Sequence, residues 1–243
     1  MTTMNLPSEL NNLGVSFLES GDAAGAFEAF REAVDRMNSV AAHCSDAKGA
    51  KEPTSFPNKS FPSGCLLSFR NDIEVPRAKR DNISADLSIF VSKEAFGLLE
   101  CCSVQSPTLD TIWRSSILLH NLALAMHLIG IETGHHPSLR KALKLYRFSK
   151  KLIVAYLEAD DRKESDEVGT TNTRVVMSIL NNMGQIHHEL QHYDTARDYF
   201  DCLTQMLAAH DSTDMKAKER CNHVGLLLNA LLLRQEPSVA AAA

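Results

Sequence analysis

The segment LNNLGVSFLESGDAAGAFEAFREAV, residues 10–34, decides the fold. A Ser20-Gly21-Asp22 break divides it into two runs with apolar residues at helical spacing: Leu10, Leu13 and Phe17 in the first, and Ala26, Phe30 and Ala33 in the second. Small and polar residues between two periodic runs are typical of a turn. The segment therefore predicts a helix, a tight turn and a second helix that packs back on the first.

A second segment, ILNNMGQIHHELQHYDTARDYFDCL at residues 179–203, repeats the first almost position for position. In each segment a glycine of the first helix precedes an alanine of the second by 12 residues: Gly14 and Ala26, then Gly184 and Ala196. A small residue at a crossing lets two helices approach closely, so we expect each glycine to lie against its alanine. Two copies of one hairpin indicate a repeat protein.

Two further units are less regular. Helical periodicity over Ile112–His127 and Leu139–Leu157 predicts another hairpin, but its small residues Ala123 and Ala142 lie 19 apart, so we expect a seven-residue insertion in its turn. The run CNHVGLLLNALLL at residues 221–233 matches a first helix alone, with Gly225 as its small residue. A single amphipathic helix at this place would cap the array.

These units resemble the tetratricopeptide repeat (TPR), which places apolar residues, a small residue and an aromatic on one helix and Ala, aromatic, Ala on the next. The resemblance covers residues 7–38 and 112–233. It implies an all-α, superhelical array of three antiparallel helix pairs plus a capping helix. The repeat specifies the fold far more than the function.

The first unit is separated from the middle unit by residues 39–111, in which prolines recur among Ser, Lys and Asn residues. Such composition cannot sustain a helix, so we expect a long, irregular and flexible insert. Its runs Cys65–Phe69 and Leu87–Val91 contain β-branched and aromatic residues that allow one or two short strands. The tail, residues 234–243, is expected to be disordered.

Composition limits the class of partner. The chain has 25 Lys and Arg against 30 Asp and Glu, so its net charge of -5 removes the broad attraction to phosphates that nucleic-acid binders display. Its start lacks the basic region and apolar stretch of a secretory signal, and runs such as Val224–Leu228 are too short to span a bilayer. Six cysteines without C-x-x-C spacing are expected to be free thiols. We therefore expect a cytoplasmic protein that binds neither nucleic acid nor membrane, although the basic run Pro76–Arg80 leaves a nuclear location open.

An asparagine lies two residues before the small residue of each complete unit: Asn12, Asn121 and Asn182. The motifs LNNLG, LHNLA and LNNMG are similar to the asparagine ladder of kinesin-light-chain-type repeats, and the resemblance implies that this column faces a concave groove that grips extended peptides. A carboxamide can donate to and accept from a peptide backbone at once. The expected peptide-binding set is Asn12, Asn121, Asn182, Asn222, Gln185, His127 and His188. Alternatively, the asparagines satisfy neighbouring helix ends or face water.

Other chemistry is less well supported. No basic residue accompanies the asparagine column, which disfavours a carboxylate clamp for chaperone tails. The segment His188-Glu189-Leu190-Gln191-His192 fits the zinc-protease pattern H-E-x-x-H, but the repeat register puts His192 in a turn, so we expect no metal, no cofactor and no catalytic residue. The favoured function is a non-enzymatic scaffold that binds an extended segment of a partner protein. The alternatives are a zinc-dependent hydrolase, and a self-associating structural protein in which the insert occupies the groove.

Overall fold

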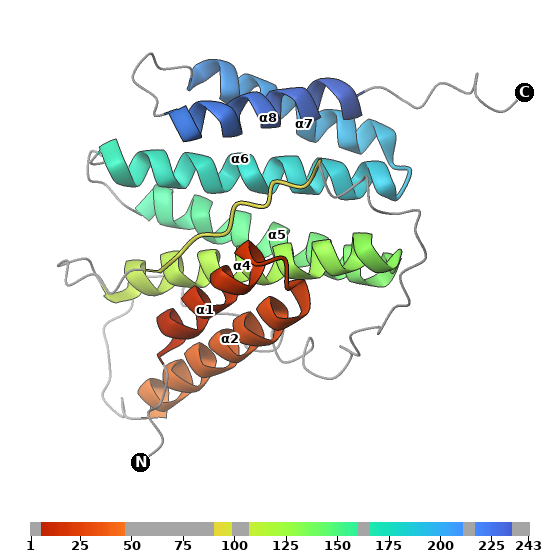
Figure 1. Cartoon of the computed structure of the whole chain (residues 1–243). Coiled ribbons are helices and arrows are strands. Elements are labelled where there is room, and N and C mark those ends of the chain that lie inside the picture. The colour runs from red at the N-terminus through yellow and green to blue at the C-terminus, as the bar shows by residue number, and fades with distance from the viewer. Residues whose placement is uncertain (1–5, 47–89, 99–106, 160–165, 211–216, 235–243) are drawn as a thin grey trace, which may run out of the picture.

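The computed structural model describes residues 6–46, 90–98, 107–159, 166–210 and 217–234, and over these residues the protein is all-α without a strand. Its helices are α1 (Pro7–Glu19), α2 (Ala23–Asp46), α4 (Pro107–Thr133), α5 (His136–Ala159), α6 (Asp166–Glu189), α7 (Tyr193–Ala209) and α8 (Ala217–Leu233). Helices that follow each other through tight turns form the pairs α1–α2, α4–α5 and α6–α7, and α8 packs on α7 and α6. Figure 1 shows these pairs stacked in chain order.

Tight turns join the helices in all three pairs, including the middle pair, where a seven-residue insertion was expected in the turn. Each contains one residue in the left-handed region: Gly21 (φ 82°), Gly134 (φ 64°) and Gln191 (φ 61°). Glycine reaches this region without steric cost, which explains its presence at two of the three turns. Gln191 occupies the third, so the repeat keeps this backbone conformation even where its sequence does not favour it.

The glycines at the helix crossings lie against an aromatic ring, which the sequence analysis had not expected. A Cβ added to Gly14 would lie 2.4 Å from Cε1 of Phe30, and one added to Gly184 would lie 2.8 Å from Cε1 of Phe200. The atoms nearest to each glycine therefore belong to an aromatic ring, which comes four residues after the alanine that we expected there. The small residue thus makes room for a ring of the second helix.

The sequence analysis expected the seven extra residues of the middle pair to form a longer turn. In the structure they lengthen the two helices instead. Asn12 and Asn182 lie nine residues before the left-handed turn residue of their pair, whereas Asn121 lies 13 residues before Gly134. The second helix is longer as well, because Ala142 follows Gly134 by eight residues and Ala26 follows Gly21 by five. Both helices are thus extended by about one turn, which satisfies the extra backbone groups within the helices.

The boundaries of the insert also differ from the expected ones. Helix α2 continues through Asp46 and α4 begins at Pro107, so both flanking helices reach into the range 39–111 that was expected to be irregular. Residues 47–89 and 99–106 lie outside the described residues, and so do the expected strand at 65–69 and the tail from 235 onward. The remaining part, residues 90–98, is an extended segment that begins with a 3-10 turn at Phe90 and a bend at Val91, where a strand was allowed.

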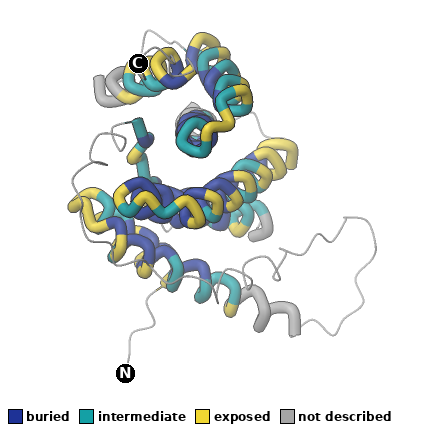
Figure 2. The backbone as a smooth tube through the Cα atoms, turned by 90° about the vertical axis from the view of Figure 1, so that its right-hand side faces the viewer, coloured by how far each residue is buried: buried dark blue, intermediate teal, exposed yellow. Residues whose placement is uncertain are grey.

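Helix α4 is the centre of the core. It packs against both α2 and α5 and also touches α1 and α6, and every residue from 115 to 131 is buried (Figure 2). The stretch Leu109–Thr133 has the length and composition of a membrane span, contrary to the expectation from the short apolar runs, but 89% of its apolar window is buried among the other helices. Its apolar character is that of a core helix, because a helix surrounded by protein is hydrophobic on all sides.

Candidate binding groove

The first helices of the pairs, α1, α4 and α6, together with α8, form a surface that we call the inner face. The extended segment 90–98 lies along it and crosses the helices in the order α8, α6, α4, α1, opposite to their order in the chain (Figure 1, yellow). Its residues Val91, Phe96 and Leu98 are only 4–8% exposed and belong to the same apolar core as the helices. The candidate site is therefore filled by a segment of the chain itself.

The asparagine column holds the backbone of this segment. Asn12 accepts from the backbone N–H of Leu98 (2.8 Å) and donates to its carbonyl oxygen (2.9 Å). Asn121 binds Phe96 in the same way (3.0 and 2.8 Å), and so does Asn182 with Ser92 (2.8 and 3.1 Å). Each carboxamide thus pairs with both backbone groups of one residue, a contact that an extended chain offers at every second residue.

The residue before each asparagine of the column adds a second contact. Asn11 donates to the carbonyl oxygen of Phe96 (3.0 Å), and Asn181 donates to that of Phe90 (2.9 Å). On α4 this place is taken by His120, whose Nε2–H donates to the carbonyl oxygen of Glu94 (3.1 Å). The sequence analysis missed these three residues, although the Asn-Asn pair in LNNLG and LNNMG was a visible signal for two of them.

The asparagines of the column also form hydrogen bonds to side chains of the helices. Asn121 donates to Oδ1 of Asn11 (2.8 Å), and Asn182 donates to the hydroxyl oxygen of Tyr146 on α5 (3.0 Å). Asn121, Asn182 and Tyr146 are fully buried, so these bonds form in a medium where water cannot replace them. The carboxamides are therefore held in the orientation that the segment needs.

On α8 the structure corrects the expected residue. Asn229, rather than Asn222, donates to the carbonyl oxygen of Phe90 (2.8 Å) and to Oδ1 of Asn181 (3.1 Å). Asn222 is exposed two turns earlier in the helix, and a Cβ added to Gly225 would meet nothing within 4 Å, so Gly225 is not the small residue of a crossing. The leucine-rich run 226–233 fits several helical registers equally well, which is why the sequence could not identify the right one.

The other expected binding residues are Gln185, His127 and His188. Gln185 is fully buried in α6, and His127 lies inside the α4–α5 pair with its ring edge-on to Tyr146 (centroids 6.1 Å apart). His188 is half-buried at the end of α6, beside the ring of Tyr193 (5.2 Å). In the part of the chain that is described, neither histidine ring forms a hydrogen bond to residues 90–98.

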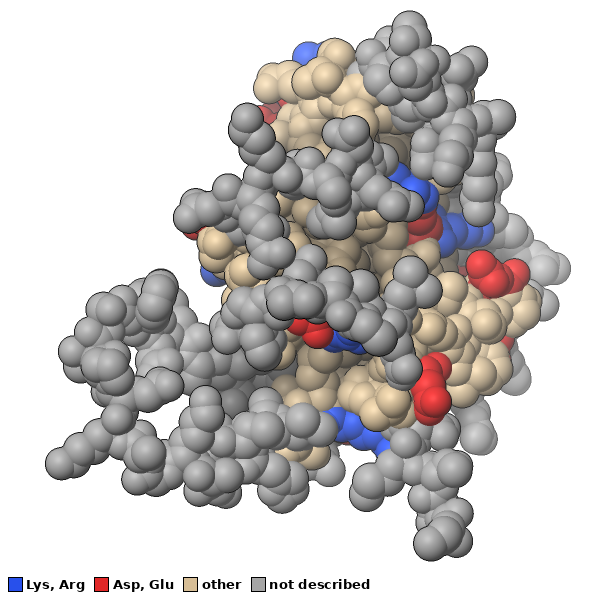
Figure 3. All heavy atoms as spheres, turned by 90° about the vertical axis from the view of Figure 1, so that its left-hand side faces the viewer, with Lys and Arg blue, Asp and Glu red and all other residues tan. Residues whose placement is uncertain are grey.

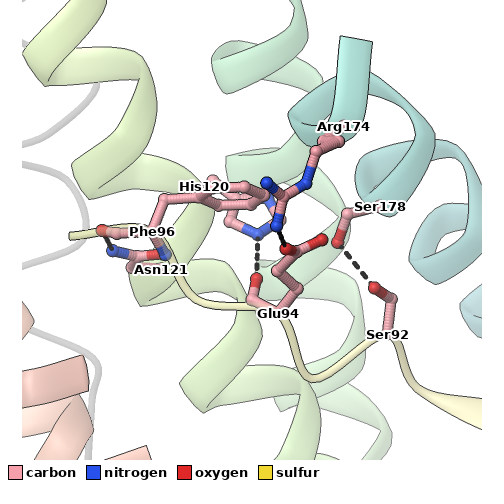
Figure 4. Close-up of polar contacts among 7 residues, drawn as sticks. All are labelled: Ser92, Glu94, Phe96, His120, Asn121, Arg174 and Ser178. Carbon is pink, nitrogen blue, oxygen red and sulfur yellow. Dashed lines mark hydrogen bonds and ion pairs between the residues drawn. The ribbon is translucent and has the colours of Figure 1, made fainter. Parts of the chain in front are cut away.

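The side chains of the segment alternate between two sides, as expected for an extended chain. The even positions point to the helices (Figure 4): the Ser92 hydroxyl accepts from Ser178 (3.0 Å), Glu94 pairs with Arg174, and the Phe96 ring meets His120 edge-on (5.3 Å). Among the odd positions, Lys93 and Gly97 are exposed, whereas Val91 lies in the apolar core and Ala95 is half-buried against it. The inner face thus provides a distinct contact for each second residue of the segment.

Burial keeps two histidines of α4 neutral. Desolvation lowers the pKa of His120 from 6.5 to about 4, against the opposing effect of the hydrogen bond to the Glu94 carbonyl. The pKa of His127 falls to about 3 for the same reason. His120 therefore acts at neutral pH as an uncharged donor through Nε2, and the contact with the segment needs no counter-charge.

The H-E-x-x-H segment does not form the helical arrangement that the zinc pattern requires. Helix α6 ends at Glu189, and Gln191 turns the backbone through a positive φ, so His192 precedes α7 and lies near His187 (ring centroids 5.6 Å apart). Two ligands at positions i and i+4 bind one metal only when they share a helical face. No group of three or more His, Cys, Asp or Glu residues suited to a metal lies together within the described ranges.

Charge on the surface is mixed. The face drawn in Figure 3 shows basic and acidic side chains interspersed among the described residues, without a large patch of one sign. Helix α5 carries four exposed basic residues at helical spacing, which we call the basic stripe of α5: Arg140, Lys144, Arg147 and Lys151.

Comparisons with known proteins add no identification. No protein-family model matches the chain, and neither a curated protein nor a solved structure was found to match it.

Proposed function

We propose that this protein is a non-enzymatic scaffold of the TPR kind that binds an extended segment of a partner protein on its inner face. One observation supports the proposal above all others: Asn12, Asn121 and Asn182 each bind both the N–H and the carbonyl group of one residue in an extended chain. The resemblance of the three asparagine motifs to kinesin-light-chain-type repeats points in the same direction.

Contacts of this type suit the binding of peptides. Every peptide has the same backbone groups, so a row of carboxamides stabilises any extended chain that fits, and neighbouring side chains then select among sequences. In the free protein, segment 90–98 takes the place of the ligand. A partner must displace it, and its affinity is lowered because a tethered competitor has an effective concentration on the order of millimolar.

A second function is favoured by the burial of the segment. Val91, Phe96 and Leu98 lie in the core cluster, so segment 90–98 can also be a permanent part of the fold that closes the inner face. In that case the protein would interact with partners through other surfaces, such as the exposed basic stripe of α5. The two functions differ in one testable property, the exchange of the segment for another peptide.

The test uses a variant whose segment is displaced. Glu94→Arg and Phe96→Asp place a positive charge beside Arg174 and a carboxylate in an apolar site, which disfavours the bound segment without changing any helix. We call this double variant the displaced variant, and its far-UV circular dichroism is expected to stay helical. Panning a phage-displayed library of random nonapeptides against it should enrich peptides that bind.

A matched control shows whether the asparagines are responsible. The displaced variant with additional Asn121→Ala and Asn182→Ala substitutions should enrich no peptides, since each lost hydrogen bond to a desolvated partner costs about 1–2 kcal/mol. Enrichment that persists without the two asparagines would show that peptides bind elsewhere. Failure of the displaced variant to enrich any peptide would favour the permanent structural role.

A further inference from the structure

The described inner face contains contacts that discriminate between side chains as well as those that hold the backbone. They differ from helix to helix: Arg174 and Ser178 lie on α6, whereas His120 lies on α4. The side chains that they contact lie at every second position of segment 90–98. The inner face can therefore select among the sequences of extended segments that bind to it.

The acidic position is defined by Arg174. The side chain of Arg174 is 32% exposed and that of Glu94 is 19% exposed, so the ion pair is only partly open to water. A planar guanidinium in such a place favours a carboxylate, and a basic residue would meet a like charge at low effective dielectric. This position of the occupant should therefore be acidic.

The aromatic position is defined by a row of rings. Phe96 meets His120 edge-on, and the ring of His120 in turn lies 5.6 Å from that of Tyr146. With the segment in place, His120 and Tyr146 are fully buried, so Phe96 closes a continuous row of packed rings. A smaller side chain than Phe96 would leave a void against that wall, which costs the contacts of the missing atoms.

The remaining inward positions have weaker preferences. Ser178 is 1% exposed, and its hydroxyl donates to Ser92, so a small polar residue fits there. Leu98 is 4% exposed next to the backbone contact with Asn12, which favours an aliphatic residue. Lys93 and Gly97, at odd positions, are exposed, so a residue at either position is less constrained by packing than one that is buried against the helices.

We propose that the inner face selects a partner-protein segment of the pattern small polar, x, acidic, x, aromatic, x, aliphatic, lying in the direction that residues 92–98 have in this chain. This inference rests on the proposed function and adds its specificity. Direction follows from the side chains and also from the asparagines, because the bonds from Asn121 to Asn11 and from Asn182 to Tyr146 fix the side on which each amide nitrogen lies. The acidic residue must lie over α6 while the aromatic residue lies over α4.

The experiment measures binding of labelled nonapeptides to the displaced variant by fluorescence anisotropy. The reference peptide has the sequence of residues 90–98, FVSKEAFGL. Replacing its glutamate by glutamine should weaken binding roughly 10-fold, and replacing its second phenylalanine by alanine should weaken it at least about 10-fold. The matched control, FVSKFAEGL, keeps the composition but exchanges these two residues, and should not bind measurably.

Two outcomes of this experiment distinguish a failure of the inferred pattern from a failure of the proposed function. If all these peptides bind equally well, the inferred pattern is wrong although the face still binds peptides. If none of them binds, including the reference, both the pattern and peptide binding by this face are wrong. A wild-type dimer that dissociates in the displaced variant would identify a second copy of the chain as the occupant and overturn the assignment to a partner protein.

A pair of charge variants tests the acidic position while segment 90–98 stays bound to the inner face. Arg174→Glu in the full chain should lower the melting temperature, because it puts two carboxylates side by side. Adding Glu94→Arg should restore the melting temperature by re-forming the pair with reversed charges. A double variant that melts no higher than Arg174→Glu alone would show that this position does not select charge.

Discussion

Replacing Asn121 by alanine tests how the segment is held in the free protein. Asn121 is fully buried and forms three hydrogen bonds: it accepts from Phe96 N–H, and it donates to the Phe96 carbonyl oxygen and to Oδ1 of Asn11. The carbonyl oxygen keeps its bond from Asn11 (3.0 Å) in the variant. The N–H of Phe96 and Oδ1 of Asn11 lose the bond that Asn121 provides.

The expected cost follows from these two groups. A buried polar group that loses its partner costs about 1–3 kcal/mol, and partial entry of water reduces the sum, so Asn121→Ala should cost about 2–4 kcal/mol. The segment can detach while the helices stay folded, since local opening needs less free energy than global unfolding. We therefore expect the loss to appear first as faster opening of residues 90–98.

Amide hydrogen exchange measures this opening directly. In the wild type the amides of Ser92, Phe96 and Leu98 should be protected, and in Asn121→Ala the protection of Phe96 should fall roughly 30- to 1000-fold, at about 1.4 kcal/mol for each factor of ten. The control is Asn222→Ala, an exposed position, which should leave all three amides unchanged. Wild-type amides that exchange as fast as those of an unfolded peptide would refute the bound segment and the reasoning built on it.

Acid should destabilise the protein, because burial lowers the pKa of His120 to about 4 and that of His127 to about 3, against the ordinary value of 6.5. Between the lowered pKa and 6.5, the unfolded state binds more protons than the folded state does. Stability to urea should therefore fall as the pH drops below about 6.5, by up to about 1.4 kcal/mol per pH unit for each histidine, and His127→Leu should flatten this dependence. A urea midpoint that is independent of pH between 7 and 5 would contradict the burial of both rings. Gly184→Val should lower the melting temperature because its added atoms collide with the Phe200 ring, whereas Gly225→Ala should keep or raise it, since the space there is open and alanine favours a helix by up to about 1 kcal/mol. Equal melting temperatures for these two variants would mean that the ring does not pack on Gly184.

The sequence predicted the helices and the asparagine column because both depend on local patterns. Periodic apolar residues and a short polar break define a helical hairpin, and the repeat of Asn12 at Asn182 is visible in two aligned copies. The middle pair was harder. Its extra residues lengthen both helices, and periodicity alone does not separate a longer hairpin from a longer turn.

The occupant of the inner face could not be predicted with the same tools. The contacts of segment 90–98 connect residues about 25 to 139 positions apart, and no local pattern encodes such a pairing. The alternation of inward side chains at Ser92, Glu94 and Phe96 mixes polar, charged and apolar types, so it does not resemble a half-buried strand. The same limit applies to Asn229, whose role depends on how α8 is rotated against α6.

The path of segment 90–98 bears on the cooperativity of unfolding. In a linear array each repeat contacts only its neighbours, so the ends can fray while the middle stays folded. Here segment 90–98 acts as a strap: it forms hydrogen bonds to α1, α4, α6 and α8, and so connects the first helix of the array to the last. While the strap is bound, the array should unfold as one unit, and once the strap is released, its two ends become independent.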